Sequence, residues 1–166
     1  MVFVYTPFEN EAPQWHKVLS RYGDRITNWK PVFEKIAKDF ALMEMRMYDS
    51  EGKSGTEGGW KPLSKNYAKW KMQHYPDRGI LEMTGAMRRA SINPKVVIGK
   101  TQLTMTIEDK KAIWHQRGHA SPTRLPQRKV VSLTGYDQIR WFKWMQAWAV
   151  DATRAPWAGA ARRGEQ

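Results

Sequence analysis

Residues 58–90, GGWKPLSKNYAKWKMQHYPDRGILEMTGAMRRA, decide the fold expected of this chain, because they are dense in residues that fix backbone geometry. Gly58 and Gly59 permit backbone angles that other residues avoid, and Trp60 follows them as a large apolar anchor. Ser64 is a typical helix N-cap, and Pro76 cannot continue a helix. The stretch therefore predicts a shaped loop and then a short helix over residues 65–75.

Two longer helices are predicted on either side of this stretch. The first covers residues 28–48, with Thr27 or Asn28 as N-cap, Pro31 in the first turn, and apolar side chains three and four residues apart. The second covers residues 136–150, and Thr134 and Asp137 resemble a capping box at its start. A weaker helical pattern before residue 22 has Gly23 as its expected end.

Between these helices the sequence predicts a small antiparallel sheet. Residues 96–98 and 103–107 flank a turn at residues 99–102, and the second run alternates apolar and polar side chains, which is typical of a hairpin covered on one face. The helix over residues 28–48 is the natural cover. A short helix ending at Gly118 and a strand over residues 129–133 should follow. The expected fold class is α+β, in which the small antiparallel sheet packs against the long helix over residues 28–48 and the C-terminal helix over residues 136–150, with flexible arms and loops.

The length of 166 residues fits one domain, which we expect to span residues 1–150. Residues 1–26 are interpreted as a possible arm and a short helix. The glycine-rich residues 49–59 predict a flexible loop. Residues 151–166 are predicted to be a flexible C-terminal tail.

Charge points to an anionic partner. The chain has 28 basic and 16 acidic residues, a net charge of +12, and no acid between residues 110 and 136. Such a surface could neutralise phosphates without reading sequence. It could equally pair with acids of an adjoining subunit or protein, and both interpretations stay open. The candidate contacts are Arg117, Arg124, Arg128 and Lys129.

Tryptophan is unusually frequent, with nine residues in the chain. Tryptophan is enriched at protein interfaces as well as in cores, and the apolar stripe of residues 136–150 is wider than a helix packed on one side requires. We interpret the surplus as a subunit contact, the alternative being a helix sunk deeply in its own core. The candidate interface residues are Trp60, Trp114, Trp141, Trp144 and Trp148.

Catalysis is not expected. The absence of cysteine excludes disulfides, thiolate catalysis and cysteine-based zinc sites. His115 and His119 are four residues apart, but Gly118 interrupts the helix and no glutamate completes a metalloprotease pattern. We therefore predict no catalytic, cofactor-binding or metal-binding residue and no enzymatic activity. No window approaches the ~20 apolar residues of a membrane span, so no membrane partner is expected.

An ordered series of short motifs over about residues 60–133 resembles the phage virion morphogenesis, or tail completion, family. The first block holds a tryptophan, a Pro-Leu-Ser turn, further aromatics, a Thr-Gly turn and two arginines, and the second holds alanine, His-Gln, glycine and Pro-x-Arg. The residues of the series are Trp60, Pro62, Leu63, Ser64, Tyr67, Trp70, Lys71, Ile80, Leu81, Thr84, Gly85, Arg88 and Arg89, then Ala112, His115, Gln116, Gly118, Pro126 and Arg128.

The resemblance implies a structural protein of the phage neck, assembled in the host cytoplasm and retained in the virion. It would form a homo-oligomeric ring, of six subunits as one option, that joins the DNA-filled head to the tail. Its other expected partners are a head-side connector protein, a tail terminator or tail tube protein, and genomic double-stranded DNA in the channel. The charge alone supports an alternative, a non-catalytic, sequence-independent DNA-binding protein.

Overall fold

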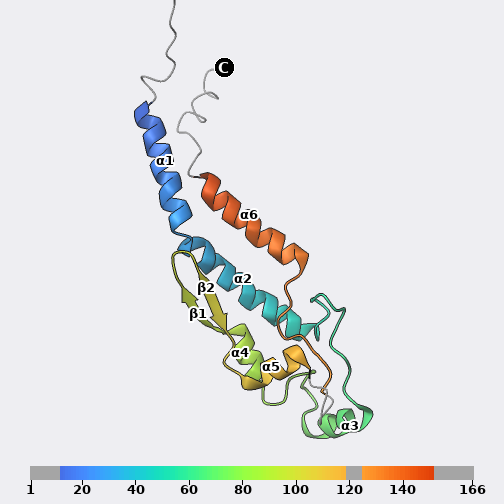
Figure 1. Cartoon of the computed structure of the whole chain (residues 1–166). Coiled ribbons are helices and arrows are strands. Elements are labelled where there is room, and N and C mark those ends of the chain that lie inside the picture. The colour runs from blue at the N-terminus through green and yellow to red at the C-terminus, as the bar shows by residue number, and fades with distance from the viewer. Residues whose placement is uncertain (1–11, 119–124, 152–166) are drawn as a thin grey trace, which may run out of the picture.

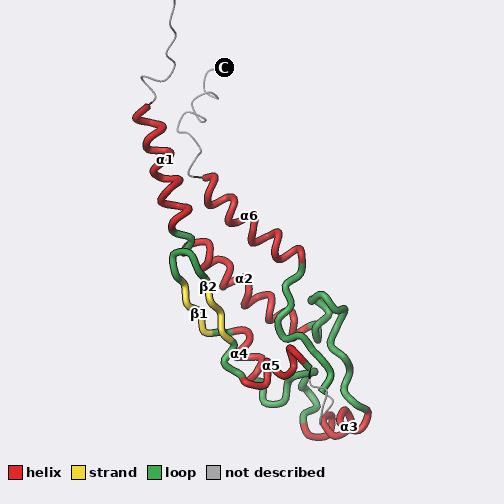
Figure 2. The backbone as a smooth tube through the Cα atoms, viewed as in Figure 1, coloured by secondary structure: helices red, strands yellow, loops and turns green. Residues whose placement is uncertain are grey.

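The computed structural model describes residues 12–118 and 125–151, which form a long, narrow molecule (Figure 1). This part of the chain contains six helices and one two-stranded antiparallel sheet, which confirms the α+β class with a helical majority (Figure 2). In chain order the elements are α1 (Ala12–Thr27), α2 (Lys30–Asp49), α3 (Lys65–His74), α4 (Ala86–Ile92), β1 (Lys95–Ile98), β2 (Leu103–Thr106), α5 (Lys110–Arg117) and α6 (Gly135–Asp151).

Helix α2 is the element on which most others pack. Its first half buries Val32, Phe33 and Ile36 against the hairpin and α6, and its last turn packs against α4 and Trp60. Pro31 lies in the first turn, as predicted. The predicted N-cap, Thr27 or Asn28, was one or two residues early, because Trp29 occupies that position. The amide of Trp29 donates to the carbonyl of Lys100 at 2.8 Å.

Helix α1 continues past Gly23 to Thr27, so the predicted end at Gly23 was wrong. Contacts with α6 explain the extra turn. The guanidinium of Arg25 donates to the carbonyl of Trp148 at 3.1 Å, and the Trp148 indole donates to the carbonyl of Arg25 at 3.2 Å. Tertiary contacts of this kind outweigh the cost of one glycine inside a helix, which is about 1 kcal/mol.

The hairpin forms as predicted, with Ile98 opposite Leu103 beside the turn. Both of these side chains pack on the apolar cluster of α2, while Val97 faces away and is exposed. The expectation that the long helix covers one face of the sheet is confirmed.

Helix α5 is capped by Asp109 and stops before Gly118, as expected. The strand predicted over residues 129–133 is absent. The side chain of Gln116 takes the place of a partner strand. Its Oε1 accepts from the amides of Val130 (2.8 Å) and Val131 (2.9 Å), and its Nε2 donates to the carbonyl of Val131 (2.9 Å). The extended segment is thus satisfied without pairing to a second strand.

After α2 ends at Asp49, residues 50–59 form successive turns that fold back on the domain, so a loop is present where one was predicted. Gly52, with a φ of 84°, lies against the Trp60 ring, where a Cβ would come within 2.5 Å of an indole carbon. The hydroxyl groups of Thr56 and Ser132 lie 2.8 Å apart. The expected arm at residues 1–11 and tail at residues 152–166 lie outside the described residues.

Candidate functional site

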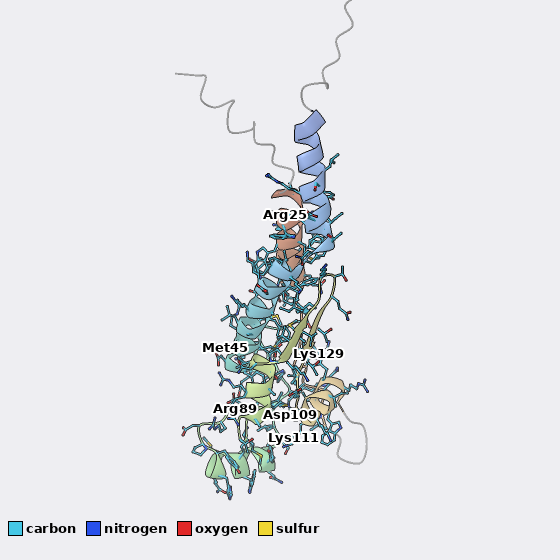
Figure 3. The ribbon with its side chains drawn as sticks, turned by 90° about the vertical axis from the view of Figure 1, so that its left-hand side faces the viewer. Arg25, Met45, Arg89, Asp109, Lys111 and Lys129 are labelled. Carbon is cyan, nitrogen blue, oxygen red and sulfur yellow. The ribbon has the colours of Figure 1, made fainter. Side chains whose placement is uncertain are left out.

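A cavity of about 680 Å³ lies at the end of the molecule formed by α3, α4 and α5. Its wall includes the chain before α3, the turn before α4 and the first turns of α4 and α5. In Figure 3 the start of α5, marked by Asp109 and Lys111, lies at this end, far from Arg25 at the other. Much of the lining is apolar, including Leu63, Leu81 and Met87. A volume of this size suits a ligand or a short peptide segment.

Two buried cations line the cavity. Lys71 on α3 is 5% exposed, and its ammonium donates to the carbonyl of Gly79. Arg128 is 4% exposed, and its guanidinium donates through Nε to the carbonyl of Lys61 (2.7 Å) and through Nη2 to that of Pro62 (3.0 Å). Among the described residues, neither cation has a carboxylate within ion-pair distance. Neutral carbonyl groups accept the hydrogen bonds of both cations, and the carboxylates of Glu82 and Glu51 add a longer-range attraction at Lys71.

The two acids that line the cavity are already engaged. Glu82 accepts from the Arg88 guanidinium at 2.8 Å, and the same guanidinium binds Asp49 at 2.5 Å. Asp109 caps α5, because its Oδ1 accepts from the amide of Lys111 at 2.8 Å. The cavity therefore keeps an excess of positive charge.

The pKa values of the cationic groups change accordingly. Burial lowers the pKa of Lys71, and it also lowers that of Arg128. Burial, and then the charge of Arg128, lower the pKa of His115, so its imidazole is neutral at pH 7. The Nδ1 atom of His115 is buried without a hydrogen-bond partner in the described part of the chain. Burial is the largest cause of each of these three changes.

The turn before α4 holds unusual backbone geometry. Leu81, which lines the cavity, has a φ of 64°, and Gly85 has a φ of 73°. The left-handed region is costly for leucine, and such strain gathers at binding sites. The amide of Glu82 closes this turn on the carbonyl of Gly79 at 3.1 Å.

Helix α6 presents two apolar faces. On the inner face Trp141, Trp144 and Trp148 are half-buried against the first half of α2. The carboxylate of Asp39 fixes this contact by accepting from the Trp141 indole at 2.7 Å and from the Arg140 guanidinium at 2.5 Å. The predicted capping box also forms, since Thr134 and Asp137 exchange hydrogen bonds at the start of the helix.

The outer face of α6 carries Ile139 and Phe142, with Tyr136 beside them. Ile139 is 57% exposed and Phe142 is 59% exposed. At 3.6 residues per turn these two lie opposite the three tryptophans. Apolar side chains thus cover both sides of the helix, although the described structure packs only one of them.

The predicted interface tryptophans differ in their burial. Trp60 is buried in the core, and its indole donates to the carbonyl of Lys129 at 2.7 Å, which corrects its assignment to a subunit surface. Trp141, Trp144 and Trp148 are half-buried on the face of α6 that packs on α2, so the exposed apolar side chains of this helix are other residues. Trp114 on α5 remains exposed.

The residues predicted to contact an anion also lie in different environments. Arg128 is buried, so the assignment of its side chain to a DNA surface is wrong, because a duplex cannot reach it. Lys129 pairs with Glu57 at 2.8 Å. Arg117 is exposed on α5, and Arg124 lies outside the described residues.

Sequence reasoning missed Lys71 and Glu82 as cavity residues and Ile139 and Phe142 as surface residues. Lys71 was named only as a member of the motif series, and no sequence signal marked its burial. A helical-wheel comparison of residues 139 and 142 with residues 141, 144 and 148 could have found the outer face.

The described residues offer neither a metal site nor a membrane span. They contain no group of three or more His, Asp or Glu that could hold a metal ion. No helix among them is long and apolar enough to cross a membrane. Comparisons of the chain with models of protein families, with curated proteins and with solved structures returned no match. The resemblance to the tail completion family rests on its motif residues alone.

Proposed function

We propose that this chain is a non-catalytic structural subunit of a phage neck, where copies of it form a ring that joins the DNA-filled head to the tail. The observation that carries the proposal is the outer face of α6. Large apolar side chains there are more than half exposed in the single chain. Patches of this kind mark interaction surfaces. The motif series over residues 60–133 supplies the identity of the assembly.

The elongated shape supports self-association. Helices α1 and α6 lie beside each other at one end, joined by reciprocal hydrogen bonds between Arg25 and Trp148. Exposed apolar residues of α1, Leu19, Tyr22 and Ile26, add to the apolar surface of this region. A contact between unlike faces of neighbouring copies closes into a ring when its rotation closes.

Electron microscopy of phage lysate tests this function. In a phage whose copy of this gene carries an early stop codon, packaged heads should stand beside separate tails of full length. Complementation with Phe142→Ser should fail to restore joined particles, whereas Gln73→Ser, at an exposed position on α3, should restore them. Normal joined particles in the stop-codon phage would refute the proposal.

The charge of +12 supports a second candidate, a sequence-independent DNA-binding protein. Because Arg128 is buried, the surface that could contact phosphates is α5, where Lys110, Lys111 and Arg117 are exposed. This candidate predicts tight duplex binding that weakens steeply with salt, and a shallower salt dependence when these three residues are changed to alanine. A salt slope that the triple variant leaves unchanged would count against it.

A further inference from the structure

The cavity between α3, α4 and α5 combines positive charge with apolar walls, which suits an anionic occupant that also carries apolar groups. Lys71 and Arg128 line it as buried cations without a carboxylate partner in the described residues, while Leu63, Leu81 and Met87 supply apolar surface. Charge-assisted hydrogen bonds to a carboxylate are stronger than bonds to a carbonyl. A peptide with acidic and large apolar side chains therefore fits the cavity better than a nucleic acid backbone, which offers no apolar groups to its walls.

The chain itself contains such a peptide. Residues 1–11, MVFVYTPFENE, include Glu9 and Glu11, several large apolar side chains, and no lysine, arginine or histidine, although the whole chain has a net charge of +12. These residues precede α1 and lie outside the described structure. The other terminal segment, residues 152–166, has three arginines and one acid, so it would bring like charge to Lys71 and Arg128.

We propose that the cavity receives residues 1–11 of a second copy of this chain, with Glu9 or Glu11 against Lys71 and Arg128 and with Phe8 on the apolar wall. The inference rests on the proposed function only in that both require self-association. It names a contact that the outer face of α6 does not provide.

Geometry requires that the donor be another copy. Helices α1 and α2 follow one another along the long axis of the molecule, and the cavity lies beyond the end of α2 (Figures 1 and 3). With 16 and 20 residues at 1.5 Å each, the two helices span roughly 50 Å. The three residues from Glu9 to Glu11 reach only about 10 Å from the start of α1. A chain therefore cannot fill its own cavity.

The contact would join unlike ends of neighbouring molecules, because the arm leaves one end and the cavity lies at the other. Such a heterologous contact repeats around a ring. The groups of this contact are separate from those of α6, so each contact can be removed while the other remains.

Cysteine cross-linking tests the proposal in the full chain, which has no native cysteine to give background. A Phe8→Cys chain is mixed under mild oxidation with a tagged Met83→Cys chain, since Met83 lines the cavity and is partly exposed. The matched control is Met72→Cys, which is more exposed and lies on α3 outside the cavity. The mixed dimer should form at least about tenfold faster with Met83→Cys than with Met72→Cys.

The acidic residues supply the second arm of the test. Adding Glu9→Gln and Glu11→Gln to the Phe8→Cys chain should slow the cross-link by about tenfold, and this change leaves the folded domain untouched. Three results would overturn the proposal. They are equal rates with the two cysteine positions, no effect of the glutamine changes, and an intramolecular disulfide in a Phe8→Cys/Met83→Cys chain.

A third cysteine position tests whether the arm binds instead in the groove between α2 and α6. Ala147→Cys marks the groove between α2 and α6, where Lys35 lies 4.1 Å from the Trp144 ring centre. Faster cross-linking there than at Met83→Cys would place the arm on the wrong site and refute the inference. Cross-linking to the cavity together with normal particles in the stop-codon phage would leave the arm contact standing and reject the neck function. Separate heads and tails without the cross-link would reject the arm contact and support the neck function.

Discussion

Glu44 gives the sharpest test of the folded structure. It lies in the second half of α2 and is 0% exposed, and neither carboxylate oxygen has a hydrogen-bond partner in the described residues. Burial raises its pKa from 4.5 to about 8. The carboxyl group is therefore protonated in the folded chain at neutral pH, because ionising it would leave a charge without water or a partner.

The sign and size of the effect follow from linkage. The folded state holds this proton more tightly than the unfolded state, so the contribution of Glu44 is fully present below pH 4.5 and is lost as the pH rises toward 8. Each pH unit in that window lowers the free energy of unfolding by about 1.4 kcal/mol. Between pH 4.5 and pH 7 the loss from this one group is about 3 kcal/mol.

Glu44→Gln removes the titration and nearly keeps the shape of the side chain. Urea unfolding of both chains at about pH 4.5, 6, 7 and 8 should show a difference in unfolding free energy that grows with pH. This difference should favour the glutamine chain by about 3 kcal/mol more at pH 7 than at the lowest pH. Comparing the chains at each pH cancels the titration of other groups. Glu34→Gln, at an exposed position on the same helix, should show no such trend. Parallel stability curves for Glu44→Gln and the parent chain would refute the reasoning.

Three further substitutions test other contacts by urea unfolding. Gln116→Ala should lower the unfolding free energy by about 2–3 kcal/mol, because two amides and a carbonyl lose their partner, whereas Gln127→Ala removes one exposed bond and should cost under about 1 kcal/mol. Asp39→Asn should cost about 2 kcal/mol by weakening the bonds to Arg140 and Trp141, and an unchanged stability would contradict that role. Gly118→Ala should lower the unfolding free energy more than Gly58→Ala does. Both glycines have a positive φ, but only at Gly118 would an added Cβ meet a neighbour, the backbone nitrogen of Gln127 at 3.0 Å. An equal loss of unfolding free energy in the two variants would show that this contact is harmless.

The sequence predicted the helices and the hairpin because their signals are local. Pro31 and the apolar spacing after it mark α2, the alternation from Leu103 marks the second strand, and Gly118 marks the end of α5. The errors arose where distant side chains decide the backbone. Gln116 replaces a strand for residues 130 and 131, and Trp148 extends α1 beyond Gly23. No local pattern contains those partners.

The candidate site was less predictable for the same reason. Tryptophan frequency indicated association, but three of the predicted tryptophans pack on α2 and a fourth fills the core. Charge density indicated an anionic partner, yet Arg128 is inside a cavity and the lysine that accompanies it, Lys71, comes from another segment. Burial of a charged side chain depends on where the chain folds back, which composition does not record.

The hydrogen bond between the amide of Trp29 and the carbonyl of Lys100 fastens the tip of the hairpin to the junction of α1 and α2. The short ribbon therefore braces the angle at which α1 leaves the body of the molecule. In a closed ring that angle governs curvature, since a tilt of a few degrees per subunit changes how many subunits complete a full circle. In the proposed ring, the turn at residues 99–102 thus helps to hold the angle on which the bore depends.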